Sequence, residues 1–147
     1  MLDTADTAVT VDPAALRAAR ALHEAMGVAA RETAEGLTPV QLSGLRVVAG
    51  LESGATVAQV AEALGVVASN ASRLVDRLVA YGVVHRARAR SDRREVRVSL
   101  SGQGRRLLER IDAAQVDRLG RAIAGLPGGE RAALVAALGA AVPAAQE

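Results

Sequence analysis

The sequence predicts a mainly α-helical fold that carries one small β-hairpin. Apolar residues recur at helical spacing through most of the chain, and between residues 85 and 100 they change to the two-residue alternation of β-strands. Half of the 147 residues are hydrophobic, but only 1% are aromatic. We therefore expect one domain, or one small domain with helical extensions, around an aliphatic core.

The first expected helix begins at Asp12-Pro13, with the aspartate as N-cap and the proline in the first helical position. It ends near Gly36. One face of this helix is mostly apolar and carries Leu16, Ala19, His23, Met26 and Ala30.

Two capping boxes, each a threonine followed three residues later by a glutamine, open the next two helices at Thr38–Gln41 and Thr56–Gln59. Glycines close these helices, at Gly50, Gly54 and Gly65. A fourth helix runs from about Val67 to Tyr81, with the inward stripe Ala71, Leu74, Val75 and Leu78. Two short helices joined by a glycine-containing turn are typical of a helix-turn-helix.

A two-stranded hairpin is expected directly after this helix pair. The alternation runs from His85 to Arg90 and again from Glu95 to Leu100, with residues 91–94 between them as a loop. A hairpin in this position is a wing, so the predicted core is a winged helix-turn-helix.

Two more helices follow the hairpin. Ser101 caps a long one whose apolar face carries Leu107, Leu108, Ile111, Gln115, Leu119, Ala122 and Leu126. Pro127-Gly128-Gly129 breaks the chain, and a last helix runs from Glu130 to Val142. Both helices are more apolar than a small wing domain needs to cover itself, and together with the first helix they predict a homodimer interface.

Positive charge is concentrated in one segment. Residues 73–106 contain ten arginines and three acidic residues, a net +7, whereas the whole chain carries only +2, so the remainder is at −5. A localised basic field on an acidic body is typical of a protein that binds a polyanion, most often nucleic acid. All eighteen basic residues are arginine, which suits bidentate contacts to phosphate and guanine, although GC-rich codon usage would produce the same bias.

The candidate DNA-binding residues lie on the fourth helix and on the wing. On the outward side of the helix we assign this role to Ser69, Asn70, Ser72, Arg73 and Arg77. On the wing we assign it to Arg88, Arg90, Asp92, Arg93 and Arg94, the last three at the tip. Asp92 either orders a neighbouring arginine or favours the turn through its own backbone. For each element alone, an ordinary solvated surface is the alternative interpretation.

Several functional classes are excluded by composition and spacing. The chain has no cysteine, no histidine and carboxylate spacing typical of a metal site, no nucleophile–base pair and no phosphate-binding glycine loop. We therefore expect no enzyme, no cofactor and no metal. Because the start lacks a signal-peptide pattern and the longest apolar run is broken by Gly139 and Pro143, we expect a cytoplasmic protein with no membrane partner.

The chain resembles the MarR (multiple antibiotic resistance regulator) family of winged-helix repressors from about Pro13 onward. The resemblance rests on Leu37 to Gln41, on Ser72 to Leu78 with Gly82-Val83-Val84 after it, and above all on Asp92 to Gly104, which is similar to the family's D-x-R…L-[TS]-x-x-G signature. It implies that the helix from Val67 reads DNA and that Arg94 enters the minor groove.

Two departures from the family's pattern affect these expectations. Where relatives commonly cap the recognition helix with serine or threonine, this chain has Val66-Val67, so that the helix is either uncapped or begins at Ser69. The family's effectors are often phenolic or aromatic acids, but Tyr81 is the only aromatic residue here. A different small-molecule effector, or none, is expected, and the sequence identifies no effector-binding residue.

The sequence thus predicts three parts: residues 1–36 as an N-terminal tail and dimerisation helix, 37–101 as the DNA-binding winged helix, and 102–147 as C-terminal dimerisation helices. The predicted function is a homodimeric transcriptional repressor or activator that binds a pseudo-palindromic site on double-stranded DNA. The alternative is a helical interaction module whose basic wing binds an acidic protein.

The two classes of arginine should differ when tested. We expect Arg94→Ala to weaken binding to cognate and unrelated duplexes alike, because a wing tip contacts any sequence. Arg73→Ala should weaken mainly cognate binding, by about 1–3 kcal/mol, because a helix arginine contacts base edges. Gel-shift titrations with both duplexes measure this difference, and identical curves for the wild type and both variants would contradict the assignment.

Overall fold

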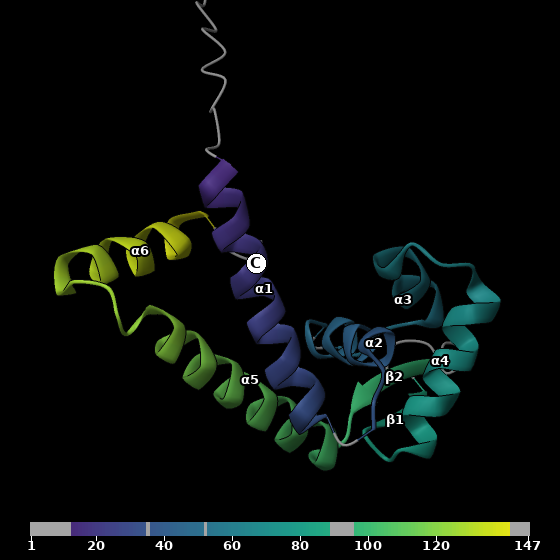
Figure 1. Cartoon of the computed structure of the whole chain (residues 1–147). Helices are drawn as coiled ribbons and strands as arrows, with labels where there is room; N and C mark the ends of the chain where they lie inside the picture. The colour runs from purple at the N-terminus through teal and green to yellow at the C-terminus, as the bar shows by residue number, and fades with distance from the viewer. Residues whose placement is uncertain (1–12, 35, 52, 89–95, 142–147) are drawn as a thin grey trace, which may run out of the picture.

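The computed structural model describes residues 13–34, 36–51, 53–88 and 96–141, without the side chains of residues 14 and 139–141. Two lobes are visible in Figure 1: a compact lobe of helices and a hairpin, and an arm of longer helices. The elements in chain order are α1 Pro13–Thr33, α2 Pro39–Ala49, α3 Val57–Leu64, α4 Ala68–Ala80, β1 Val84–Arg88, β2 Val96–Leu100, α5 Gly102–Ile123 and α6 Gly128–Ala141.

Both predicted capping boxes are confirmed. At the start of α2, the Gln41 amide donates to Thr38 Oγ1 at 3.3 Å and the Thr38 amide donates to Gln41 Oε1 at 2.7 Å. At the start of α3, Thr56 and Gln59 repeat the exchange at 3.1 and 2.9 Å. Because each box satisfies two otherwise unpaired amides, it defines where the helix begins.

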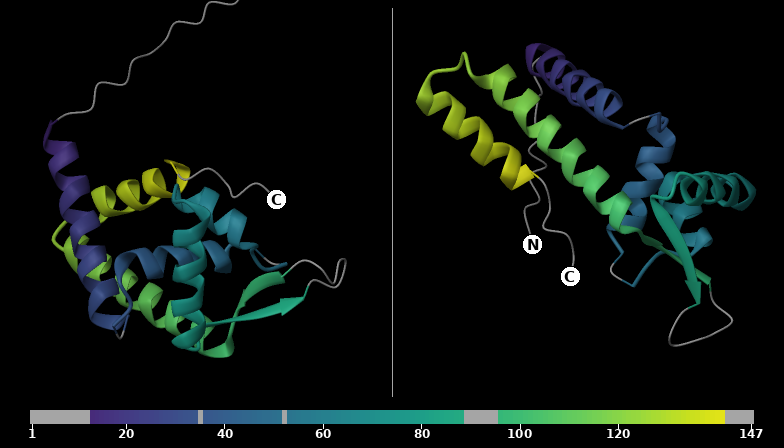
Figure 2. Two further views of the ribbon diagram at one scale, coloured as in Figure 1. Left: turned by 90° about the vertical axis from the view of Figure 1, so that its right-hand side faces the viewer. Right: turned by 90° about the horizontal axis from the view of Figure 1, so that it is seen from below.

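The predicted hairpin is confirmed as an antiparallel pair with Val84 opposite Leu100 and Arg86 opposite Val98. A residue from the α2–α3 connection extends this sheet, since Ala55 and Val98 exchange two backbone hydrogen bonds of 2.8 Å. Ala55 and Val98 are fully buried. Figure 2 shows the hairpin extending from one edge of the lobe. The predicted strand residues 89, 90 and 95 and the loop 91–94 lie outside the described part of the chain.

The core is aliphatic, as predicted, and it joins the two lobes. The largest fully buried side chains come from α2, α3, α4, β2 and α5, namely Leu45, Val48, Val60, Val75, Leu78, Val98 and Ile111. The C-terminal part of α1 adds Ala30 to the same cluster, and Ala34, directly after the helix, also belongs to it. Helices α1 and α5 of the arm pack on each other and on the compact lobe, which we call the wing domain. The wing domain and the arm therefore share one hydrophobic core.

Much of the arm remains uncovered in a single chain. Leu16 of α1, Val116 of α5 and Val135 of α6 are 48%, 69% and 56% exposed. The predicted apolar face of α1 is therefore buried only toward its C-terminal end, at Ala30.

Two predictions about the C-terminal helices need correction. Helix α5 ends at Ile123, so Leu126 lies in the turn, and α6 begins at Gly128, two residues before the predicted start. The break is made by Pro127, whose carbonyl accepts the first helical hydrogen bond of α6, from the Arg131 amide at 3.0 Å. Gly128 and Gly129 are thus in the first turn of a helix and do not end one.

The backbone of α5 approaches that of the wing closely at the junction between the two. The Ser101 hydroxyl donates to the Gly82 carbonyl at 2.6 Å and accepts from the Gly104 amide at 3.0 Å, which caps α5 as predicted. The Ser101 amide donates to the Val83 carbonyl at 3.0 Å. Gly104 lies so close to that carbonyl oxygen that a Cβ atom would overlap it.

A substitution at this junction tests its importance. We expect Gly104→Ala to lower the free energy of unfolding by about 1–3 kcal/mol, because the added methyl group must displace backbone atoms. Gly120→Ala is the control in the same helix, where no atom lies within 4 Å of the added carbon. The control should leave stability unchanged or raise it by up to about 1 kcal/mol. Urea unfolding at equal protein concentration measures both, and equal losses would refute the packing argument.

Candidate nucleic-acid interface

Helix α4 presents one apolar and one polar face, as the sequence predicts. Ala71, Val75 and Leu78 are buried against the core. Of the five candidate residues on the helix, Ser69, Asn70, Arg73 and Arg77 are exposed, whereas Ser72 is only partly exposed. The helix therefore offers polar and cationic groups to a partner along one side.

The start of α4 resolves one alternative that the sequence leaves open. Val67 occupies the N-cap position with extended backbone angles, φ −68° and ψ 150°, and forms no side-chain capping bond. The helix begins directly after it, at Ala68, so it is uncapped and not shifted to Ser69. Gly65, in the left-handed conformation with φ 62°, ends α3 and sets the turn between the two helices.

A shallow hollow lies between α4 and the N-terminus of α2. It has a volume of about 230 Å³ and is bounded by Thr38, Val40, Gln41, Asn70, Arg73, Leu74 and Arg77. Two of these residues are arginines, and the positive end of the α2 dipole adds to their field. A phosphate group of a nucleic-acid backbone suits such a surface.

Of the five candidate DNA-binding residues on the wing, the structure describes only Arg88. Arg88 is exposed at the end of β1, and Arg90, Asp92, Arg93 and Arg94 lie outside the described residues. Within the described part of the chain, no ion pair involves Arg73, Arg77 or Arg88. Their positive charges therefore remain available to a partner.

Two wing arginines have structural contacts that the sequence analysis did not identify. Arg97 donates to the Gly54 carbonyl at 3.0 Å and so joins β2 to the α2–α3 connection. Arg86 forms an ion pair with Asp76 of α4, with 2.8 Å between Nη2 and Oδ1. In the sequence, the only indication of the Arg86–Asp76 ion pair is that Asp76 is the single acidic residue of α4.

Residues 35–95, from the segment before α2 to the end of the wing loop, match the model of the MarR family. Over this segment the chain is similar to the MarR family. Its winged-helix fold, mainly helical with one antiparallel hairpin, is that of MarR regulators. No curated protein matches the sequence.

Solved structures extend the likeness beyond the wing domain. RV1404 from Mycobacterium tuberculosis is 27% identical with a TM-score of 0.77, over 95% of this chain and 99% of that one. CouR from Rhodococcus jostii, solved with p-coumaroyl-CoA, is 28% identical with a TM-score of 0.59, over 89% and 91%. A point mutant of MepR from S. aureus, solved with an oligodeoxyribonucleotide, is 21% identical with a TM-score of 0.66, over 88% and 94%.

A cavity lies where the arm meets the wing domain. It has a volume of about 330 Å³ and is lined by His23, Met26, Gly27, Ala30, Arg31, Ala34, Leu37, Pro39, Leu42, Ser43, Arg46 and Gln115. These residues are mostly apolar, and the ones that can carry charge are two arginines and a histidine. The cavity therefore suits an aliphatic body with an anionic group.

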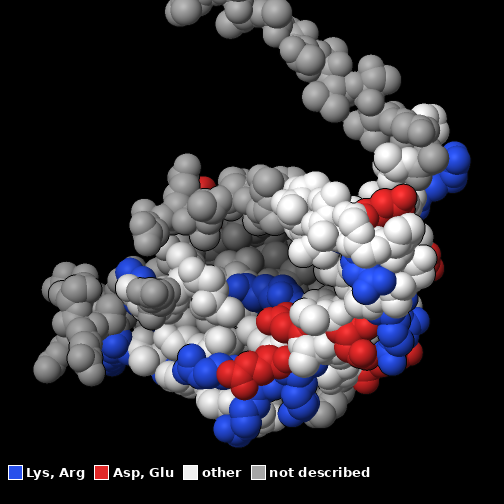
Figure 3. Space-filling view, turned by 90° about the vertical axis from the view of Figure 1, so that its left-hand side faces the viewer, with Lys and Arg blue, Asp and Glu red and all other residues white. Residues whose placement is uncertain are grey.

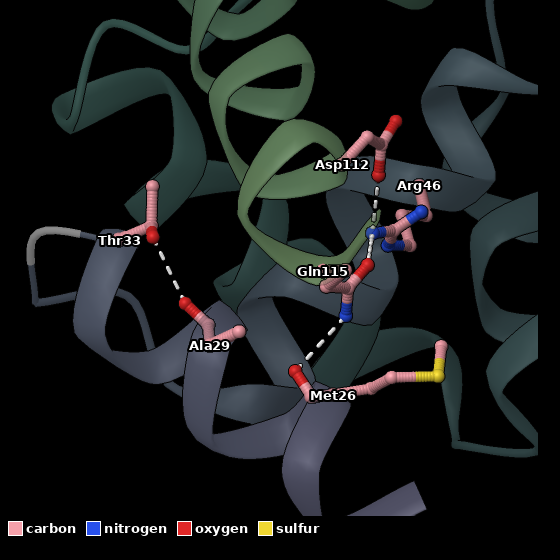
Figure 4. A network of polar contacts seen from close by, with 6 residues as sticks. All are labelled: Met26, Ala29, Thr33, Arg46, Asp112 and Gln115. Atoms are coloured by element: carbon pink, nitrogen blue, oxygen red, sulfur yellow. Dashed lines mark hydrogen bonds and ion pairs between the residues drawn. The ribbon is translucent and has the colours of Figure 1, made fainter. Parts of the chain in front are cut away.

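A polar network borders this cavity and connects three helices (Figure 4). Arg46 Nη2 of α2 lies 2.7 Å from Asp112 Oδ1 and 2.9 Å from Gln115 Oε1 of α5. The Gln115 amide group donates to the Met26 carbonyl of α1 at 3.1 Å. Arg46 and Asp112 are 43% and 56% exposed, so their ion pair contributes little to stability.

The surface of the arm differs from that of α4. Figure 3 shows the side formed by α5 and α6, where acidic and basic residues lie interspersed. Ion pairs on this arm include Arg118 with Glu32 and Arg121 with Asp117. Among the described residues, no helix is long and apolar enough to cross a membrane, and no cluster of histidine and acidic residues could hold a metal ion.

Proposed function

We propose that this protein is a sequence-specific, DNA-binding transcriptional regulator that acts as a homodimeric repressor on a pseudo-palindromic operator. The observation that carries the proposal is the surface of α4, where Asn70, Arg73 and Arg77 are exposed and the arginines have no ion pair among the described residues. In a MarR-family fold, such a surface beside a wing matches the shape and charge of a DNA groove. The oligodeoxyribonucleotide in the MepR structure supports this at the level of the fold.

Each group of candidate residues has its own role in the proposal. Helix α4 enters the major groove, where Ser69, Asn70, Ser72 and Arg73 contact base edges. Arg77 neutralises backbone phosphates. The wing lies alongside in the minor groove through Arg88, Arg90, Asp92, Arg93 and Arg94.

The dimer is proposed from the uncovered apolar surface of the arm. Exposed residues such as Leu16, Val116 and Val135 come from α1, α5 and α6, outside the segment 37–101 that binds DNA. A second copy would cover these side chains, since a two-fold interface joins the same surface on both chains. Residues 1–36 and 102–147 are then the dimerisation parts.

Selection of bound duplexes from a random DNA pool tests the proposal. We expect an inverted repeat whose half-sites are centred about 34 Å apart, because two symmetric recognition helices occupy successive major grooves. Light scattering at micromolar concentration should give the mass of a dimer. A monomer, or selected sites without symmetry, would contradict the dimeric part of the proposal. Salt-sensitive binding to an acidic protein without duplex binding would favour an interaction module instead.

The cavity between the lobes supports a regulatory role for a small molecule. We propose an effector with an aliphatic body and a carboxylate, which competes with Asp112 for Arg46. Because Arg46 lies on α2 and Asp112 on α5, this competition would separate the wing domain from the arm and change the spacing of the two recognition helices.

Decanoate is a suitable probe of this effector site. We expect decanoate to lower the affinity of the wild type for its selected duplex, because the cavity ligand removes the Arg46–Asp112 link. Arg46→Met, which lacks this link from the start, should bind the duplex about as weakly as the wild type does with decanoate and should respond little to decanoate. Arg20→Met, outside the cavity, should keep the wild-type affinity and response. Fluorescence anisotropy of a labelled duplex measures all three. An equal response in the wild type and Arg46→Met would exclude this role for Arg46.

A further inference from the structure

Asp76 is an unfavourable residue on a helix that is to approach DNA. It is the only acidic residue of α4, its side chain is 56% exposed, and it lies next to Arg77 and one helical turn after Arg73. A carboxylate at this place repels phosphates and reduces the attraction that the two arginines provide. The structure must therefore compensate for its charge if α4 reads DNA.

The compensating charge comes from the wing. Arg86 of β1 places Nη2 2.8 Å from Asp76 Oδ1. Residues alternate between the two faces of a strand, so Arg86 shares its face with the buried Val84 and with Arg88, one position further along. Among the described residues, Arg88 has no ion pair, which makes the two arginines a matched comparison on one strand.

We infer that Arg86 is a positioning residue for DNA recognition. It neutralises Asp76 and draws the carboxylate toward the wing, so that α4 presents only Arg73 and Arg77 as charged groups to the duplex. The same ion pair sets the wing relative to the recognition helix, because it joins a residue of β1 to a residue of α4. This inference rests on the proposed DNA-binding function and goes beyond it, since Arg86 acts on DNA through Asp76.

Because the Arg86–Asp76 ion pair is exposed, we expect its loss to affect DNA binding and not folding. Arg86 and Asp76 are 38% and 56% exposed, and water screens such a pair. We therefore expect the variants at both positions to keep the wild-type melting temperature within a few degrees. Loss of affinity for DNA can then be attributed to charge and position.

A double-mutant cycle tests the inference. Arg86→Ala alone should weaken binding to the selected duplex by about tenfold, because it leaves an unpaired carboxylate facing phosphates. In the Asp76→Asn background, the same substitution should change affinity by less than about threefold, because no carboxylate remains to be neutralised.

Arg88→Ala is the control, with an equal loss expected in both backgrounds, because Arg88 has no link to Asp76. An equal loss for Arg86→Ala in the two backgrounds would overturn the inference and make Arg86 a direct DNA contact. If the wild type binds no duplex at all, the proposed function fails, and the inference fails with it.

A measurement without DNA separates these failures. The Arg86 side-chain Nε–H resonance should shift in the Asp76→Asn protein, while the Arg88 resonance should not. An unshifted Arg86 resonance would show that the ion pair does not form in solution, whatever the protein binds.

Discussion

The junction at Ser101 and Gly104 is the contact on which the geometry of the rest depends. Ser101 caps α5, and it bonds to the backbone of both Gly82 and Val83, where α4 ends and the wing begins. Gly104 permits this approach because it has no Cβ atom. Helix α4, the wing and the arm therefore meet at a few backbone atoms, and α5 is joined directly to the wing.

Arginines of the same basic segment have different physical roles. Arg86 forms an ion pair with Asp76, and Arg97 donates a hydrogen bond to the Gly54 carbonyl. Both contacts lie inside the wing domain. Others on the same surface, such as Arg73, have no ion pair among the described residues. The high local charge thus orders the wing and, under the proposed function, also attracts DNA. An arginine orders the wing where an acidic side chain or a carbonyl oxygen lies within hydrogen-bonding distance of it, and otherwise its charge stays available to a partner.

The boundary between arm and wing domain combines a shared apolar core with an exposed polar link. The core contacts of Ala30 and Ile111 are buried and costly to break, whereas the Arg46–Asp112 pair is exposed and weak. Such a boundary allows small rotations about a stable contact. In the proposed regulator, this boundary would couple a cavity ligand to the spacing of the two recognition helices.

The sequence by itself determined the helices, both capping boxes, the wing and the polar face of α4, because capping, periodicity and charge are local properties. It also carried the family resemblance. It did not reveal the Ala55–Val98 bridge, the Arg86–Asp76 pair or the Arg46 network, since these join residues of different elements, whose separation in space is set only by folding. It misplaced the start of α6, where proline and glycine together predict a longer break than the backbone needs. Only the tertiary structure decided which charges are paired, because pairing depends on distances in the folded chain.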